Sequence, residues 1–175
     1  MKRDITRYKG RYLSLLERDR WEFASRSNSS GVVVIVAVTE NREIVLVEQF
    51  RKPVAMDVIE LPAGLVGDLD DEFETTLVAA ARELEEETGF EAAHMEILME
   101  CPSSAGMSDE IISFVLASGL KRTGPGGGDD SEDIRVHTIP LERVDSWLHE
   151  QAALGKPMDP KIYAALYWLS QNQGS

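Results

Sequence analysis

The chain has 175 residues, a single cysteine and a formal net charge of −13. Its length fits one globular domain, and its negative charge repels phosphate polymers, which argues against nucleic acid as a partner. Cys101 alone excludes an internal disulfide, and the three histidines lack the spacing of zinc ligands. The longest apolar run, Val32 to Val38, is too short to span a membrane, and no apolar secretory segment follows Met1. A cytoplasmic protein without a membrane partner is therefore expected.

The chain is expected to start with a β-hairpin. Two strand-like runs, Tyr12 to Leu16 and Arg20 to Phe23, flank a polar turn at residues 17–19. Further strands are predicted over residues 31–38, 43–49, 58–61, 95–99, 111–117 and 134–139. A mobile loop rich in Gly and Asp is expected at residues 122–133, and amphipathic helices at residues 141–154 and 161–169. Because strands and helices mix without a regular βαβ alternation, we predict an α/β sandwich around a mixed sheet.

One long helix is predicted over residues 72–88. Asp71 and Glu74 have the spacing of a capping box, and Gly89 suits a left-handed C-cap. At about 100° per residue, Glu83, Glu86 and Glu87 share one narrow face of this helix. The side chains expected to pack on the sheet lie on the opposite face, at Leu77, Ala81, Leu84 and Thr88.

The carboxylate face calls for a positive partner. Like charges three and four residues apart destabilise a helix, and these three lie toward the negative end of its dipole. Arg82 supplies one positive charge nearby. A cluster of hard oxygen ligands also suits Mg²⁺, with Mn²⁺ as a substitute. The alternative interpretation is a Glu-rich helix face that only contacts solvent.

The residues around the cluster stand in a fixed register. The segment Arg82-Glu83-Leu84-Glu85-Glu86-Glu87-Thr88-Gly89-Phe90, with Glu74 ahead of it, resembles the signature of Nudix hydrolases, G-x5-E-x7-R-E-U-x-E-E-x-G-U. The opening glycine would fall on Asp68, whereas the equivalent glycine is Gly64, so the loop carries extra residues. Glu72 or Asp71 could replace Glu74 in space, with Glu74 capping the helix. Glu74 is therefore given no catalytic role.

The similarity extends beyond this box. Residues 48–53, 59–65 and 102–110 resemble the stretches that flank the box in ADP-ribose pyrophosphatases, a subgroup of the family. The resemblance implies a Nudix-type α/β/α sandwich over residues 29–175 with a mixed sheet. It also implies an amino-terminal β-hairpin extension over residues 1–28 that takes part in a homodimer.

The same resemblance implies a division of labour among the acidic residues. Glu83 and Glu87, with the carbonyl of Ala63, would hold the metal, while Glu86 would bind metal or orient water. Arg82 would brace the carboxylates, and the alternative is a simple salt bridge to Glu86. A mobile carboxylate in the glycine-rich loop would take the proton from water. Glu132 is the first choice for that group, with Asp130 and then Glu110 as the alternatives.

Substrate contacts are also implied by the resemblance. Arg51 would contact the diphosphate, with a surface arginine as the alternative, and Lys52 is a weaker candidate. The base would stack on hairpin aromatic rings supplied by the second subunit, which could instead fill a hydrophobic interface without touching ligand. The residues implied in substrate binding are Tyr12, Trp21, Glu22, Arg26, Arg51 and Leu65, with Glu22 accepting from the adenine amino group.

The hypothesis for function is the metal-dependent hydrolysis of ADP-ribose to AMP and ribose 5-phosphate. A pyrophosphate is protected from water mainly by its own charge, so a metal site that neutralises it and activates water fits the expected residues. Two alternatives stay open. One is a Nudix hydrolase for another nucleoside diphosphate sugar, such as ADP-glucose or GDP-mannose. The other is a catalytically silent Nudix-like module that senses ADP-ribose.

Overall fold

The computed structural model describes residues 4–27, 29–67, 74–128 and 132–172. In chain order the elements are β1 (Ile5–Lys9), β2 (Leu13–Arg18), β3 (Trp21–Arg26), β4 (Gly31–Ala37), β5 (Glu43–Arg51), β6 (Met56–Glu60), β7 (Ala63–Val66), α1 (Thr76–Thr88), β8 (Phe90–Pro102), β9 (Ile111–Arg122), β10 (Arg135–Pro140), α2 (Val144–Ala153) and α3 (Lys161–Gln171). No helix within these described ranges is long and apolar enough to cross a membrane.

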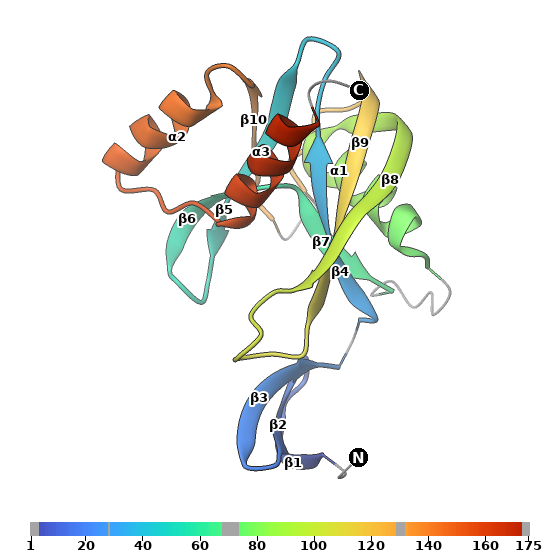
Figure 1. The fold of residues 1–175 in the computed structure, drawn as a ribbon, viewed down its shortest axis with the longest axis vertical. Coiled ribbons are helices and arrows are strands. Elements are labelled where there is room, and N and C mark those ends of the chain that lie inside the picture. Colours follow the sequence, from blue (N-terminus) through green and yellow to red (C-terminus); the bar gives the residue numbers. More distant parts are fainter. Residues whose placement is uncertain (1–3, 28, 68–73, 129–131, 173–175) are drawn as a thin grey trace.

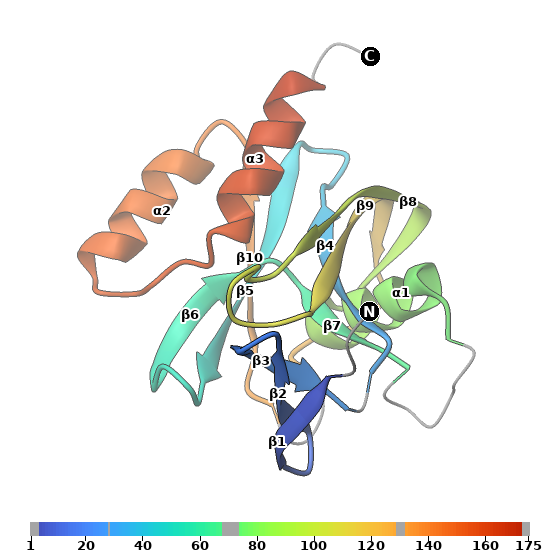
Figure 2. The ribbon, with the colours of Figure 1, turned by 60° about the horizontal axis from the view of Figure 1, so that its bottom comes forward.

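The main domain has sheets between two helical layers. One sheet has the strand order β7-β4-β9-β8, with β4 parallel to β9 and the other pairs antiparallel, and a second has the order β10-β5-β6. In β4, Val34 and Val36 belong to the apolar cluster that includes α2 and α3, whereas Val33 and Ile35 join the cluster that includes α1. Figure 2 shows α1 on one side of β4 and β9, and α2 with α3 on the other. The predicted α/β/α sandwich with a mixed sheet is confirmed.

The start of α1 differs from the prediction. The helix begins at Thr76, and the Thr75 side chain caps it by accepting from the Val78 N–H at 3.4 Å. Asp71, the predicted capping residue, and Glu72, the predicted first residue of the helix, lie outside the described residues. Glu74 does not cap the helix, because its carboxylate bonds instead to the Gly67 N–H and to Arg82. The other end is as predicted, with Gly89 in the left-handed region at φ 71°.

The buried face of α1 also differs. Leu84 and Thr88 are buried as expected, but Leu77 is 38% exposed and Ala81 is exposed. The buried stripe includes Ala79, Ala80 and Glu87 instead. Two adjacent alanines let the helix lie close to the sheet, and this orientation turns Glu87 inward. The three carboxylates therefore do not form one solvent-facing row.

The amino-terminal hairpin is present and carries one more strand. β2 and β3 pair in register, and the turn between them is Asp19-Arg20, with φ values of 51° and 70°. β1 adds to the outer edge of β2 and was not predicted, because its five residues are all exposed and give no alternating burial signal. Figure 1 shows this small sheet extending from one end of the main domain.

Strand lengths were underestimated in the middle of the chain. β8 and β9 run well beyond the predicted residues 95–99 and 111–117, and they pair with each other over almost their whole length. β7 was not predicted, because it is short and begins inside the Pro62-Ala63-Gly64 sequence, which is typical of a turn. It pairs with β4, from Val34↔Ala63 to Gly31↔Val66, and so places Ala63 and Gly64 beside α1.

Candidate active site

β7 and α1 approach closely at Gly64. A Cβ atom added at Gly64 would lie 1.9 Å from the carboxylate carbon of Glu83 and 2.4 Å from its Cγ. A side chain at this position would therefore displace Glu83. Glycine is required here for contact rather than for an unusual backbone angle, and this contact fixes the carboxylate of Glu83 against the β7 backbone.

Arg82 joins three carboxylates. Its Nε donates to Glu74 at 3.0 Å, and its Nη1 donates to Glu83 at 2.7 Å and to Glu86 at 3.1 Å. Its Nη2 donates to the Leu65 carbonyl of β7 at 3.1 Å. Burial acts to lower the pKa of Arg82, but the hydrogen bonds and charges of Glu74 and Glu83 outweigh burial and raise that pKa above its usual range. The guanidinium plane thus ties the helix face to β7.

Glu74 belongs to this network. Its side chain is 6% exposed, and its pKa is held below the ordinary value chiefly by the bond from Arg82. The displaced signature glycine argues against a catalytic role for Glu74, but seven residues separate it from Arg82, as in the signature. The longer loop leaves Glu74 in the position that the signature spacing implies.

The three glutamates of the helix face have different surroundings. The side chain of Glu86 is 49% exposed and that of Glu83 is 12% exposed, whereas Glu87 is 3% exposed. Glu87 accepts from the Ala63 N–H at 3.1 Å. Burial raises the pKa of Glu87 to about 8, and the charges of Glu83 and Glu132 add to this rise, while the Ala63 N–H and Arg51 oppose it.

The carboxylates suit a divalent cation without being arranged around one. In the part of the chain that the structure describes, no three His, Cys, Asp or Glu side chains converge on a metal position. Glu83 and Glu86 turn toward Arg82, while Glu87 turns toward β7. The donor set nevertheless fits Mg²⁺, because this cation prefers hard oxygen ligands such as carboxylates. It would also supply a positive counter-charge for the buried Glu87 carboxylate.

A cleft of about 340 Å³ lies beside these carboxylates. It brings together residues from the hairpin, β5, β7 and α1, as well as Glu132 from the segment before β10. Its lining residues are Arg26, Val32, Arg51, Ala63, Gly64, Leu65, Glu83, Glu110 and Glu132. Ala63, Glu83, Arg51 and Glu132 thus meet in one cavity, whereas Glu86 and Glu87 are not among its lining residues.

Arg51 enters this cleft already paired. Its Nε and Nη2 donate to the two carboxylate oxygens of Glu60 at 2.6 and 2.7 Å. Glu60 lies on β6, is 5% exposed and was missed in the sequence. The sequence feature that could have identified Glu60 is an acidic residue at the end of the strand that follows the strand of Arg51. The bidentate pair holds the guanidinium at the rim of the cleft.

Three predicted base-binding residues lie outside the lining of the cleft. Tyr12 and Trp21 are 51% and 64% exposed, and Glu22 is also exposed. The Trp21 Nε1 donates to the Gly106 carbonyl at 3.1 Å, on the loop between β8 and β9. Among the described hairpin residues, Arg26 alone lines the cleft, where it pairs with Glu110 at 3.2 Å.

The glycine-rich segment before Glu132 is bonded to the end of α1. The Gly127 N–H donates to the Glu87 carbonyl at 2.8 Å, and the Gly128 N–H donates to the Glu86 carbonyl at 3.0 Å. A Cβ at Gly126, where φ is 69°, would lie 2.4 Å from the Thr88 backbone. The last carbonyls of the carboxylate helix are therefore satisfied by the segment that leads to Glu132. Asp130 lies outside the described residues.

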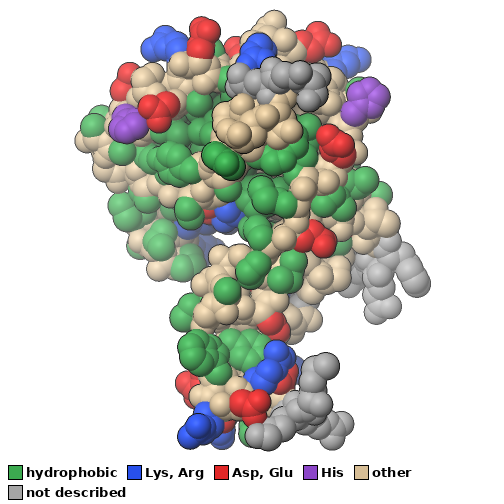
Figure 3. Space-filling view, viewed as in Figure 1, with side chains coloured by type: hydrophobic (Ala, Val, Ile, Leu, Met, Phe, Trp, Pro, Cys, Tyr) green, Lys and Arg blue, Asp and Glu red, His purple; other side chains and the backbone are tan. Residues whose placement is uncertain are grey.

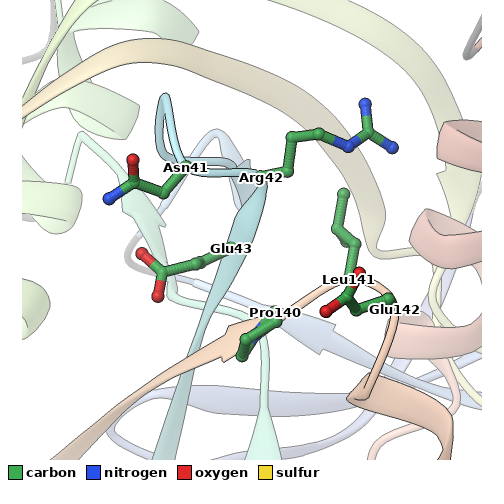
Figure 4. A pocket seen from close by; sticks show the side chains of 6 residues that line it. All are labelled: Asn41, Arg42, Glu43, Pro140, Leu141 and Glu142. Carbon is green, nitrogen blue, oxygen red and sulfur yellow. The ribbon is translucent and has the colours of Figure 1, made fainter.

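A separate depression of about 400 Å³ lies at the turn between β4 and β5 and at the end of β10. Figure 4 shows that the Arg42 side chain points away from Asn41 and Glu43, so its polar groups do not converge. The Leu141 N–H bonds to the Arg42 carbonyl, which accounts for the close approach of the two segments. This depression has none of the predicted site residues and is not the candidate site.

The matched family agrees with this geometry. The NUDIX domain matches residues 29–166. The chain belongs to the Nudix family. Its fold is also that of a solved structure described as an ADP compounds hydrolase, with a TM-score of 0.71, 22% sequence identity and coverage of 98% of this chain and 94% of the other. The sequence prediction of a Nudix hydrolase is confirmed.

Curated Nudix relatives differ in their named activities. The chain is 38% identical over 140 residues to the methanol dehydrogenase activator of Bacillus methanolicus, covering 79% of this chain and 71% of that protein. It is 41% identical over 113 residues to the ADP-ribose pyrophosphatase of Bacillus subtilis, covering 64% and 59% respectively. It is 31% identical over 174 residues to the GDP-mannose pyrophosphatase of Escherichia coli K12, covering 95% and 83%. The chain thus spans less than two thirds of the ADP-ribose pyrophosphatase.

Proposed function

We propose that this Nudix protein is a magnesium-dependent hydrolase that cleaves ADP-ribose to AMP and ribose 5-phosphate. Relatives named as pyrophosphatases of ADP-ribose and GDP-mannose support hydrolysis of a nucleoside diphosphate derivative. The observation that carries the proposal is the cleft in which Glu83 of the carboxylate helix faces the same cavity as Arg26 and Arg51. Ligands for a divalent cation and cationic groups for a diphosphate are combined there.

Glu83 and Glu87, with the carbonyl of Ala63, are the proposed ligands of Mg²⁺, for which Mn²⁺ would substitute. The bound cation would neutralise phosphate oxygens and lower the pKa of a coordinated water. Glu86 either completes this ligand set or orients the water. Arg82 holds Glu83 and Glu86 through one guanidinium nitrogen, which supports its role as the residue that braces the carboxylates.

Arg51 and Glu132 have complementary proposed roles. Glu60 occupies the Nε and Nη2 atoms of Arg51, which leaves Nη1 to contact a phosphate oxygen. Glu132 is exposed at the cleft and takes the proton from the attacking water. Glu110 also lines the cleft, but its ion pair with Arg26 favours a binding role over proton transfer. Glu132→Gln should lower kcat by about 10²-fold or more with unchanged Mg²⁺ affinity, whereas Glu110→Gln should mainly raise KM.

The amino-terminal sheet supports a homodimer. Its exposed large side chains are Ile5, Tyr8, Tyr12, Leu13, Leu15 and Trp21. Figure 3 shows hydrophobic side chains on this sheet beside charged ones. Such an apolar surface favours burial against a second copy, whose Tyr12, Trp21 and Glu22 would then reach the base. Sedimentation of the wild-type protein should give a dimer mass, and Leu13→Glu should give a monomer; an unchanged mass would contradict this interface.

Cytoplasmic localisation stays a prediction from the sequence.

The substrate is tested by a panel of pyrophosphates. Purified protein with Mg²⁺ is incubated with ADP-ribose, ADP-glucose, GDP-mannose, diadenosine polyphosphates and oxidised nucleotides, and the products are separated. ADP-ribose should give the highest kcat/KM, with AMP and ribose 5-phosphate as products. An inert ADP-ribose beside an active competitor would reject the substrate, and activity without any divalent cation would reject the metal.

GDP-mannose is the second candidate substrate. The relative named for it aligns over 95% of this chain, whereas the ADP-ribose pyrophosphatase aligns over 64%. The same panel separates the two, because the preferred nucleotide gives AMP in one case and GMP in the other. A silent sensing module is a third alternative, and tight ADP-ribose binding without hydrolysis would support it. The complete set of Glu83, Glu86 and Glu87 argues against silence.

A further inference from the structure

Gln49 is a buried amide without a partner. It lies on β5 and is 8% exposed. A glutamine side chain has two N–H donors and an acceptor oxygen. Within the described ranges, no hydrogen bond joins the Gln49 side chain to another group, although most buried polar side chains in proteins have such a partner. An unpaired buried amide destabilises the fold and therefore calls for an explanation.

Gln49 lines a second cleft, of about 440 Å³, next to the first. The two clefts share Arg51 and Glu132, so the second begins where the proposed diphosphate and proton-transfer groups lie. The other lining residues are Phe50, Lys52, Pro53 and Asp133. Gln49 thus lines a cavity that adjoins the candidate active site.

We propose that this second cleft binds the sugar phosphate half of the substrate, with the Gln49 amide bonded to sugar hydroxyls. The inference rests on the proposed function. Arg26 and Glu110, which connect the hairpin with the β8–β9 loop, line only the first cleft, so the base is expected on their side and the sugar phosphate on the other.

The chemistry of the lining fits a sugar. Hydroxyls both donate and accept hydrogen bonds, as the amide of Gln49 does, while Lys52 donates only and the carboxylate of Asp133 accepts only. The ring of Phe50 is 56% exposed and offers an apolar surface for the C–H face of a sugar. The Gln49 amide, in a cleft that Arg51 and Asp133 also line, can select among sugars by hydrogen bonding to hydroxyls next to the scissile phosphate.

The test replaces Gln49 by leucine, which has a similar volume and no polar atoms. kcat/KM is measured for ADP-ribose and for the P2-methyl ester of ADP, which keeps the pyrophosphate but lacks the sugar. The ratio of the two values should fall about tenfold in Gln49→Leu, because only ADP-ribose loses a hydrogen bond. The melting temperature should not fall, because no internal hydrogen bond is removed. Gln151→Leu on α2, the same chemical change away from both clefts, should keep the ratio.

The outcomes separate this inference from the proposed function. An unchanged ratio in Gln49→Leu overturns the subsite, and so does a lower melting temperature with an unchanged ratio. If the wild-type protein hydrolyses neither compound, the proposed function is contradicted and the subsite is decided by titration calorimetry with ribose 5-phosphate. Tighter binding by the wild-type protein than by Gln49→Leu then supports it, and equal or absent binding overturns it.

Discussion

Two buried glutamates show how differently the fold treats the same side chain. Glu48 on β5 is 2% exposed and accepts from Lys156 at 2.8 Å, from His137 at 2.9 Å and from Arg135 at 3.3 Å. Burial alone would raise the pKa of Glu48, but the bonds from Lys156 and His137 outweigh burial and hold that pKa below its ordinary value. Cations from β10 and from the segment between α2 and α3 thus stabilise its charge.

Glu87 is equally buried without that compensation. Among the described residues, its carboxylate has a backbone N–H as partner, while Glu83 and Glu132 add negative charge nearby and the pKa rises to about 8. The comparison indicates that a buried carboxylate in this protein is structural where cations of the chain reach it. Where only a backbone donor reaches it, the carboxylate is suited to bind an external cation.

The strongest test of this comparison is Glu87→Gln. Loss of a metal ligand should lower kcat/KM for ADP-ribose by about 10³-fold, because metal neutralisation of a phosphate provides several kcal/mol and each 1.36 kcal/mol is tenfold in rate. The metal-free variant should stay folded, since a neutral amide fits the buried site better than a charge. The exposed neighbour Glu85→Gln is the control and should keep nearly full activity. Undiminished turnover in Glu87→Gln would reject the metal assignment.

Glu48→Gln should show the opposite behaviour. Removing the carboxylate leaves partly buried Lys156 without its counter-charge, so the free energy of unfolding should fall by about 2–4 kcal/mol. Activity per folded molecule should change little. Urea unfolding measures the first quantity, and initial rates well below the transition measure the second. Asp145→Asn, which removes an exposed contact with His149, is the control and should change stability by less than about 0.5 kcal/mol. Equal losses in both variants would show that burial of Glu48 is unimportant.

Arg82→Lys tests whether the guanidinium geometry positions the metal ligands. Lysine keeps the charge but cannot contact Glu74, Glu83 and the Leu65 carbonyl at once. Apparent affinity for Mg²⁺ should weaken about 10- to 100-fold, the range expected when a partner of a metal ligand is lost. The Mg²⁺ dependence of the initial rate measures this change. Arg143→Lys, an exposed residue before α2, is the control. An unchanged Mg²⁺ dependence would show that only the positive charge of Arg82 matters and not the geometry of its guanidinium group.

Local sequence signals predicted much of the metal helix. Gly89 ends α1 as expected because only a residue that tolerates positive φ can occupy that position without strain. The spacing of residues from Arg82 to Phe90 was also predictive, because the spacing of charged residues along a helix determines which face of the helix they occupy. The β-branched runs of β4 and β5 gave strands for the same reason: their pattern is local.

Features that depend on tertiary contacts could not be predicted from the sequence. The rotation of α1, which exposes Leu77 and buries Glu87, depends on how closely two alanines approach the sheet. The Glu60 partner of Arg51 depends on the pairing of β5 with β6. The cleft beside Gln49 depends on Glu132 and Asp133, which are far along the chain. In each case the sequence offered the residue type but not its neighbours, and the neighbours decide its chemistry.

The last prediction is the pH dependence of stability, an effect that is small per pH unit and that distinguishes the two glutamates by sign. The pKa of Glu87 is raised on folding, so the folded protein binds more protons than the unfolded chain between about pH 4.5 and pH 8. This group should therefore lower stability as pH rises through that window, by at most about 1.4 kcal/mol per pH unit. The pKa of Glu48 is lowered, so its contribution should be lost only as pH falls below the ordinary range of a carboxyl group.

Urea unfolding with a chelator across this pH range checks the prediction. Relative to the wild-type protein, Glu87→Gln should remove the loss of stability toward about pH 8, because an amide does not titrate. Glu48→Gln should instead remove part of the loss on the acid side. Mg²⁺ should also reduce the alkaline loss in the wild-type protein, since a bound cation favours the ionised carboxylate and releases its proton. Parallel curves for the wild-type protein and Glu87→Gln would mean that Glu87 is already compensated within the chain, and the contrast between the two sites would then fail.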